Sequence, residues 1–247
     1  MEPDAELQRL IDDCYEAFAD YPRPRALHAS PLRDPVEILK TLTSAPLRQL
    51  TDEQIGPYAG YALTTVGGVD DYKHFLPRIL ELAINDPPQL GIDPPIVAHK
   101  LGRAQWLQWP ASEQEPIRTL FAAAWRHAVQ QHPDEVDPHS WLCAIAILGQ
   151  DLPAALEAWP AVPSPNAGLQ AVHFVTMYGA SLFKDNPDRR GFWSYVDEQT
   201  IETMRQWLLG EAAFKLLSSA SGPPAPVEEW KLDEALSILA ACEARRR

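Results

Sequence analysis

The sequence lacks long apolar stretches and is poor in glycine and cysteine. No run of about 18 apolar residues occurs, which excludes a transmembrane helix of ordinary length. Glycine accounts for only 12 of the 247 residues. The three cysteines, Cys14, Cys143 and Cys242, lie far apart without a CxxC pair, so we expect buried free thiols. The first residues contain neither a basic nor an apolar segment typical of a secretory signal, so we expect a cytoplasmic protein.

Positive charge is also scarce. The chain has 34 acidic and 21 basic residues, which gives a formal net charge of -13. Acidic proteins are repelled by phosphate backbones and anionic lipid, so we expect no nucleic-acid partner and no membrane partner. Complementary charge speeds association and disfavours wrong partners, so the acidity favours a basic protein partner. The simpler interpretation is that the charge only maintains solubility.

Motifs of familiar catalytic sites are missing. The chain has no GxSxG nucleophile turn, no GxxxxGK[ST] phosphate loop and no GxGxxG fingerprint. Residues 127–139 contain His127, His132 and His139 among acidic residues, but their spacing matches no metal-ligand signature. We therefore expect no metal and no cofactor, and an enzymatic function has no support from motifs.

Alternating strand patterns and Asn-Gly or Asp-Gly turns are absent as well, which predicts an all-α protein. Proline is abundant, with 24 residues, and several prolines directly follow an Asp or Ser, as they do in the first turn of a helix. These helix starts are Asp34-Pro35, Asp93-Pro94, Asp137-Pro138 and Ser164-Pro165. Thr51 and Gln54 predict a capping box at a further helix start. Apolar residues spaced by three and four predict helices over residues 7–18, 51–63, 70–85, 94–109, 112–128, 138–148, 152–159, 165–183, 197–217 and 227–244.

Helices of this length joined by short turns predict a single domain over residues 1–247. We expect an irregular α-solenoid-like stack of antiparallel helix pairs, of the HEAT or TPR kind. The clearest pair is Trp141–Trp159, in which Gly149 ends one helix and Asp151 caps the next. No 34-residue repeat is present, so the chain fits no named repeat class. Residues 218–226, which contain three serines, three prolines and one glycine, predict a linker before a C-terminal capping helix.

The segment Asp70–Leu82 reads DDYKHFLPRILEL. With its flanks it resembles an uncharacterised family of bacterial proteins that carry a similar HFLPRILEL block, and the resemblance extends over Leu50–Trp125. That family has no established activity. The resemblance therefore implies no catalytic residues and no function for this chain.

The same segment is amphipathic on a helical wheel. Its polar side consists of Asp71, His74, Arg78 and Glu81. Acid, imidazole and guanidinium together predict a polar surface that holds an anionic group or a partner side chain. The alternative is a solvated helix face with weak side-chain pairs. Pro77 predicts a kink or a new helix start near His74.

Trp106 and Trp109 lie three residues apart on one expected helix. Tryptophans in stacked helix pairs commonly fill the groove between layers. Exposed on a concave surface, they would instead anchor a partner.

These features favour a protein-binding helical scaffold over an enzyme. The most specific hypothesis is an immunity- or antitoxin-like acidic protein that neutralises a basic partner, such as a nuclease. One alternative is an enzyme or small-ligand binder with a polar pocket near His74 and Arg78, and another is a structural adaptor. The candidate binding residues are Asp71, His74, Arg78, Glu81, Trp106 and Trp109.

Overall fold

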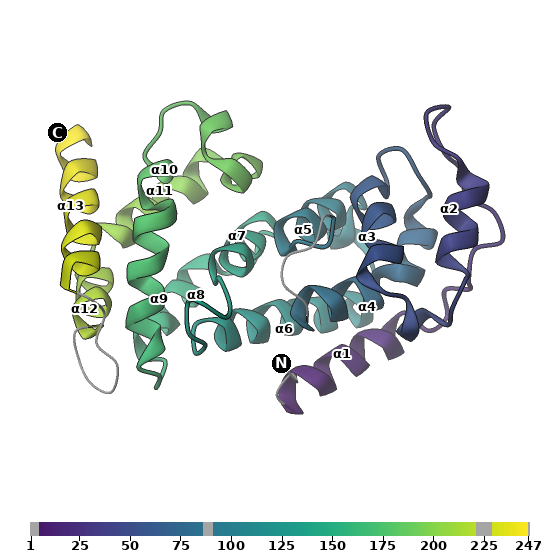
Figure 1. The fold of residues 1–247 in the computed structure, drawn as a ribbon, viewed down its shortest axis with the longest axis horizontal. Helices are drawn as coiled ribbons and strands as arrows, with labels where there is room; N and C mark the ends of the chain where they lie inside the picture. The colour runs from purple at the N-terminus through teal and green to yellow at the C-terminus, as the bar shows by residue number, and fades with distance from the viewer. Residues whose placement is uncertain (1–4, 86–90, 221–228, 247) are drawn as a thin grey trace. The chain divides into compact units, whose positions relative to one another are not determined.

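The fold consists of helices joined by turns (Figure 1). The computed structural model describes residues 5–85, 91–220 and 229–246. In these residues every regular element is a helix, apart from two isolated bridges that join Val66 to Ala29 and Ala62, so the all-α prediction is confirmed. Within the same residues no helix is both long and apolar enough to span a bilayer.

Internal contacts divide the chain into two compact units, residues 1–124 and 125–247. Each unit has its own buried apolar core. The single domain over residues 1–247 and the solenoid-like stack stay predictions. The three cysteines are buried free thiols, as predicted.

Helix α4 is the centre of the first unit, because α1, α3 and α5 all pack against it. Two of the predicted helix starts are confirmed by their hydrogen bonds. Asp34 accepts from the backbone N–H groups of Val36 and Glu37, and Thr51 and Gln54 form a reciprocal capping box. The elements of this unit are α1 (Ala5–Ala17), α2 (Pro35–Leu42), η1 (Leu47–Gln49), α3 (Asp52–Tyr61), α4 (Val69–Asn85), α5 (Pro94–Arg103), η2 (Trp106–Gln108) and most of α6 (Ala111–Ala128).

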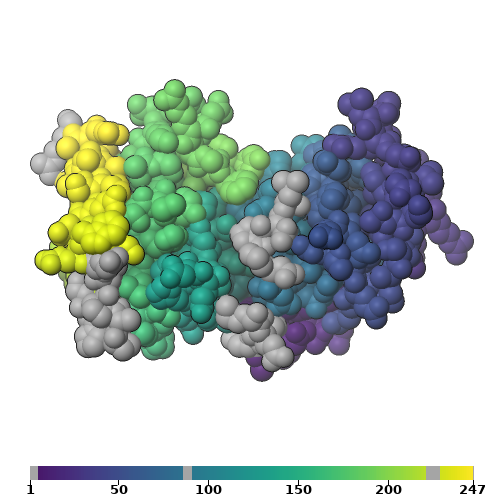
Figure 2. Space-filling model, viewed as in Figure 1, coloured from purple at the N-terminus to yellow at the C-terminus, as the bar shows by residue number. Residues whose placement is uncertain are grey.

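Helix α9 has the corresponding role in the second unit, where α12 and α13 both pack against it (Figure 1). In the space-filling view, α13 (yellow) lies against the green part of the same unit (Figure 2). Gly168 permits the close approach of α12, because an added Cβ would lie 2.7 Å from the backbone nitrogen of Ala220. The elements are α7 (His139–Ile147), α8 (Leu152–Ala158), η3 (Trp159–Ala161), α9 (Asn166–Phe174), the π-helical turn η4 (Val175–Gly179), α10 (Ala180–Leu182), η5 (Pro187–Arg189), η6 (Gly191–Tyr195), α11 (Glu198–Leu208), α12 (Glu211–Ser219) and α13 (Glu229–Arg246).

Several predicted helices are interrupted. The helix expected over 197–217 is two helices, because the chain turns at Gly210 between α11 and α12. The helix expected over 94–109 ends at Arg103, where Gln105 adopts a left-handed conformation with φ 54°. Asp93 makes no side-chain cap hydrogen bond at the start of that helix, which corrects the predicted cap.

Two further expectations concern Pro77 and the linker. Helix α4 continues through Pro77 without a new start near His74, and the proline side chain is buried. Ser218 and Ser219, at the beginning of the expected linker 218–226, are the last residues of α12. The rest of that linker, from Ser221 onward, lies outside the described residues, as does the start of the helix expected from Val227.

Candidate functional site

The apolar side of α4 forms core, as its pattern predicts. Tyr72, Phe75 and Ile79 are each no more than 1% exposed. The Phe75 ring meets Tyr58 edge-to-face, with ring centroids 4.9 Å apart. The helix is therefore held in one orientation, and its polar side faces a defined set of neighbours.

The first two residues of the polar side bond to nearby backbone. Asp71 Oδ2 accepts a hydrogen bond of 2.8 Å from the Gly68 N–H, so this carboxylate satisfies an amide at the start of α4. His74 Nδ1 lies 2.9 Å from the carbonyl oxygen of Tyr21. A carbonyl only accepts, so this ring nitrogen carries the proton. Both side chains fasten α4 to adjoining loops.

Arg78 and Glu81 are bound more tightly. Arg78 Nε donates to the carbonyl oxygen of Leu50 at 2.8 Å, and its Nη1 lies 2.7 Å from Glu81 Oε2. Glu81 Oε2 also accepts from the Tyr15 hydroxyl at 2.6 Å. Burial and this hydrogen bond raise the pKa of Tyr15. The two charged side chains are only 15% and 13% exposed, so an incoming anion would have to compete with an internal ion pair.

The structure brings a further charged group to α4 that the sequence analysis does not single out. Lys73 is 5% exposed, and its Nζ lies 2.6 Å from Glu113 Oε2 on α6 and 2.7 Å from the Tyr21 hydroxyl. The Tyr21 hydroxyl in turn donates to Glu113 Oε1 at 2.7 Å. Burial alone would lower the pKa of Lys73, but its hydrogen bonds to Glu113 and Tyr21 prevail and raise it. The ammonium therefore stays charged inside the unit.

One sequence signal marks Lys73 as a buried residue. It precedes Leu76 and Leu80 by three and seven positions, so it lies on the apolar stripe rather than on the polar side. A charge on that stripe requires a partner. The partner, Glu113, lies 40 residues further along the chain, and no sequence pattern identifies it as the partner of Lys73.

The two tryptophans are part of the core. Trp106 is 2% exposed and Trp109 is 8% exposed. The Trp109 indole donates to the carbonyl oxygen of Ala104 at 3.1 Å, and its ring lies 4.2 Å from Lys73 Nζ. This is the packing alternative of the sequence analysis, and neither ring offers much surface to a partner as it stands.

Lys100 on α5 is a second buried lysine. It is 4% exposed, and its Nζ donates to the carbonyl oxygen of Ala62 at 2.8 Å and to Thr64 Oγ1 at 3.3 Å. Burial, reinforced by nearby Arg103, lowers its pKa to about 8. Its bonds hold the turn after α3, where Leu63 has a left-handed φ of 62°. The Lys100 amine therefore stabilises this turn through its hydrogen bonds.

The histidine-rich stretch 127–139 contributes one histidine to the core of the second unit. His139 is 7% exposed, stacks on Tyr178 with ring centroids 3.7 Å apart, and accepts from the Trp193 indole at 3.0 Å through Nε2. Burial lowers its pKa to about 4, so the ring is neutral near pH 7. Across the described part of the chain, no three His, Cys, Asp or Glu side chains are grouped to hold a metal ion.

Comparison with known proteins adds no relative. Protein-family models, curated protein sequences and solved structures all give no match to this chain. The resemblance over Leu50–Trp125 therefore stays a prediction, and any function must be argued from the residues of this chain.

Proposed function

We propose that this protein is a helical scaffold that binds a basic protein partner through its carboxylates. The observation that carries the proposal is the unequal use of charge in residues 1–124, which contain 18 acidic and 11 basic residues. Within residues 5–85 and 91–124, only Arg25 and Arg103 among the basic side chains have no hydrogen-bond, ion-pair or ring partner.

Several exposed carboxylates in the same unit are not used in ion pairs among its described residues. Glu16, Asp20, Glu53 and Asp70 are exposed and have no ion-pair partner among the described residues. Exposed charges of one sign steer an oppositely charged partner and raise its association rate. An immunity- or antitoxin-like role against a basic protein would use this property, and three free thiols agree with a reducing, cytoplasmic setting.

The alternative of a ligand pocket near His74 and Arg78 has less support. His74 Nδ1 and the Arg78 guanidinium are already bonded to Tyr21, Leu50 and Glu81. A ligand there would have to replace those bonds, which lowers its net gain.

The test is a salt titration with a partner recovered by affinity capture and then purified. We expect affinity to fall steeply as salt rises, mainly through slower association, because charges separated by more than about 8 Å are screened at physiological ionic strength. Glu16→Lys with Asp20→Lys should reproduce this loss at low salt. Asp233→Lys with Glu234→Lys, a matched double reversal of exposed carboxylates in the second unit, is the control. An affinity that does not change with salt would contradict the proposal.

A further inference from the structure

A basic cleft lies within residues 125–247, apart from the residues of the α4 site. It has a volume of about 670 Å³ and is bounded by the turn after α10, helix α11 and the last turn of α13. Its basic lining residues are Lys184, Arg189, Arg205, Arg245 and Arg246. These are five of the ten Lys and Arg residues in this half of an acidic chain, so positive charge is concentrated at one place.

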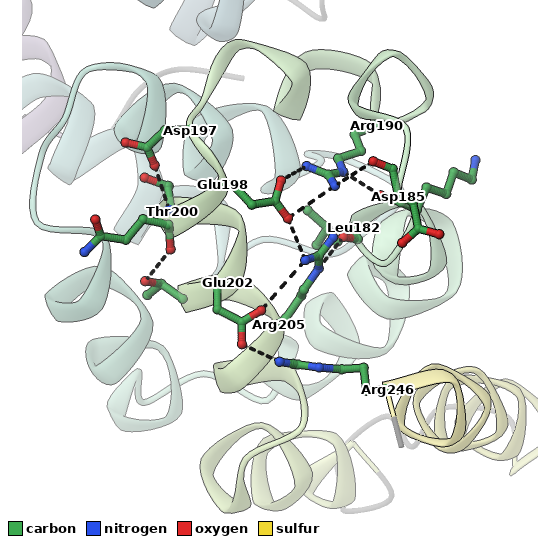
Figure 3. A network of polar contacts seen from close by, with 12 residues as sticks. Leu182, Asp185, Arg190, Asp197, Glu198, Thr200, Glu202, Arg205 and Arg246 are labelled. Atoms are coloured by element: carbon green, nitrogen blue, oxygen red, sulfur yellow. Dashed lines mark hydrogen bonds and ion pairs between the residues drawn. The ribbon is translucent and has the colours of Figure 1, made fainter.

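Arg190 connects the turn after α10 to α11 through an ion pair and hydrogen bonds. Its side chain is buried, with Nη1 2.6 Å from Glu198 Oε2, and its Nε donates to the carbonyl oxygen of Lys184 at 2.8 Å (Figure 3). Asn186 Oδ1 accepts from the Asp188 N–H at 3.0 Å, which stabilises the same turn. The backbone that carries Lys184 is therefore held in place before any ligand arrives.

Arg205 bonds α11 to α10, and Arg246 joins α13 to α11. Arg205 Nε donates to the carbonyl oxygen of Leu182 at 2.8 Å, and its Nη1 lies 2.7 Å from Glu198 Oε1. Arg246, at the end of α13, pairs with Glu202 on α11 (Figure 3). Hydrogen bonds from Arg190 to Glu198 and from Arg246 to Glu202 lower the pKa of both carboxyl groups, which therefore stay ionised. A cleft whose walls are already fixed loses little entropy when it binds a ligand.

Three of the lining cations have no acidic partner among the residues that the structure describes. Lys184, Arg189 and Arg245 are exposed, and none of them forms an ion pair with any residue in 125–220 or 229–246. The helix dipole favours cations in the last turn of α13, which accounts for Arg245 but not for the two cations on the opposite turn. These side chains converge on the cleft from separate segments, as a binding site requires.

The charge balance indicates what kind of anion fits. The five lining cations and Arg190 face three carboxylates, those of Asp185, Glu198 and Glu202. The surplus of positive charge is larger than a ligand with a single carboxylate group can neutralise. A phosphomonoester carries about 1.5 to 2 negative charges at pH 7 and offers three acceptor oxygens. Guanidinium groups match that geometry with paired N–H donors.

We propose that this cleft binds a small phosphomonoester, with its phosphate between Arg189 and Arg245. The cleft volume lies within the range of about 300–1,000 Å³ that is typical of small-molecule sites, which leaves room for an organic group beyond the phosphate. Phe183 lines the same cleft and provides an apolar surface for that group. Cys242 lines it as a buried thiol and adds no charge. The proposal does not depend on the partner surface of residues 1–124.

Isothermal titration with phenyl phosphate, benzoate and inorganic phosphate tests this at fixed low ionic strength and pH 7.5. Phenyl phosphate has both the dianion and a ring, whereas each of the others lacks one of them. We expect one phenyl phosphate per chain, with an affinity at least about tenfold higher than for benzoate or inorganic phosphate. Arg189→Gln and Arg245→Gln should each weaken it about tenfold or more, with unchanged circular dichroism.

Lys215→Gln is the matched control, because it removes one exposed cation on α12 that does not line the cleft. Its affinity for phenyl phosphate should equal that of the unaltered protein. Equal binding of the three anions, or an equal loss in Lys215→Gln, would overturn the proposal as non-specific charge attraction. Tight binding of a phosphopeptide with no binding of phenyl phosphate would overturn the choice of a small molecule.

Discussion

The two halves of this chain have almost the same charge composition and use part of it in different ways. Residues 1–124 contain 18 acidic and 11 basic residues, and residues 125–247 contain 16 and 10. In the first half, Lys73, Arg78 and Lys100 bond inside the unit. In the second half, five cations line one cleft, and three of them have no acidic partner among residues 125–220 and 229–246. The lesson is that net charge does not locate a site, because location depends on which charges are already paired.

Among the substitutions that test this comparison, removal of the Lys73 ammonium should lower the unfolding free energy most. Lys73→Met leaves Glu113 buried without its cation, and loss of one partner of a buried pair costs about 3–5 kcal/mol of unfolding free energy. Urea unfolding measures this directly. Lys40→Met is the matched control, because Lys40 pairs with Glu37 on the exposed side of α2 and such pairs contribute about 1 kcal/mol or less.

A second substitution separates charge from packing at Lys73. Lys73→Met combined with Glu113→Leu removes the unpaired charge and should recover at least half of the lost stability. If Lys73→Met lowered the unfolding free energy no more than Lys40→Met does, the buried pair of Lys73 and Glu113 would not stabilise the first unit.

Lys100 should make stability depend on pH. Burial lowers its folded-state pKa to about 8, whereas the pKa of an exposed lysine in the unfolded chain is about 10.4. Between these values the folded state binds fewer protons than the unfolded state, so stability rises with pH. The cost of burying the charged amine is fully present below about pH 8 and disappears above about pH 10.5.

The measurement is urea unfolding of the unaltered protein and Lys100→Met at pH 7.5 and pH 10. From the lower to the higher pH, the unaltered protein should gain about 2 kcal/mol relative to the variant. The difference between the two proteins cancels the titration of every other group. A gap that stays constant with pH would mean that this lysine keeps an ordinary pKa in the fold.

The smallest effect is expected at the cleft, where two adjacent arginines have different roles. Arg189→Gln should change the unfolding free energy by less than about 0.5 kcal/mol, because that side chain is exposed and unpaired. Arg190→Gln should cost more, about 1.5–3 kcal/mol, because it removes charged hydrogen bonds to Glu198 and to the Lys184 carbonyl. Equal costs at the two positions would remove the distinction between ligand-facing and structural cations.

Local signals in the sequence predicted most of the helices and several of their starts. The capping box of Thr51 and Gln54 forms as expected, because both partners lie within one turn. The break between α11 and α12 was not predicted, since the apolar spacing continues across Gly210 and a single glycine is compatible with a helix. Gln105, two residues after the end of α5, likewise adopts a left-handed conformation that its residue type does not predict.

The candidate site on α4 could be predicted only in part. Helical spacing grouped Asp71, His74, Arg78 and Glu81 correctly, because it depends only on the geometry of one helix. Their partners could not be read from spacing. Tyr15, Tyr21 and Leu50 lie in other segments, and they turn an expected open surface into a set of internal bonds.

The sequence by itself determined the all-α class, the buried face of α4 and the acidic balance of the chain, because these follow from composition and from periods of three and four residues. Only the tertiary structure decided which charges are neutralised. It paired Lys73 with Glu113 across 40 residues and left Lys184, Arg189 and Arg245 around one cleft. The physical reason is that an ion pair depends on separation in space and on burial, and neither is encoded in the order of residues along one helix.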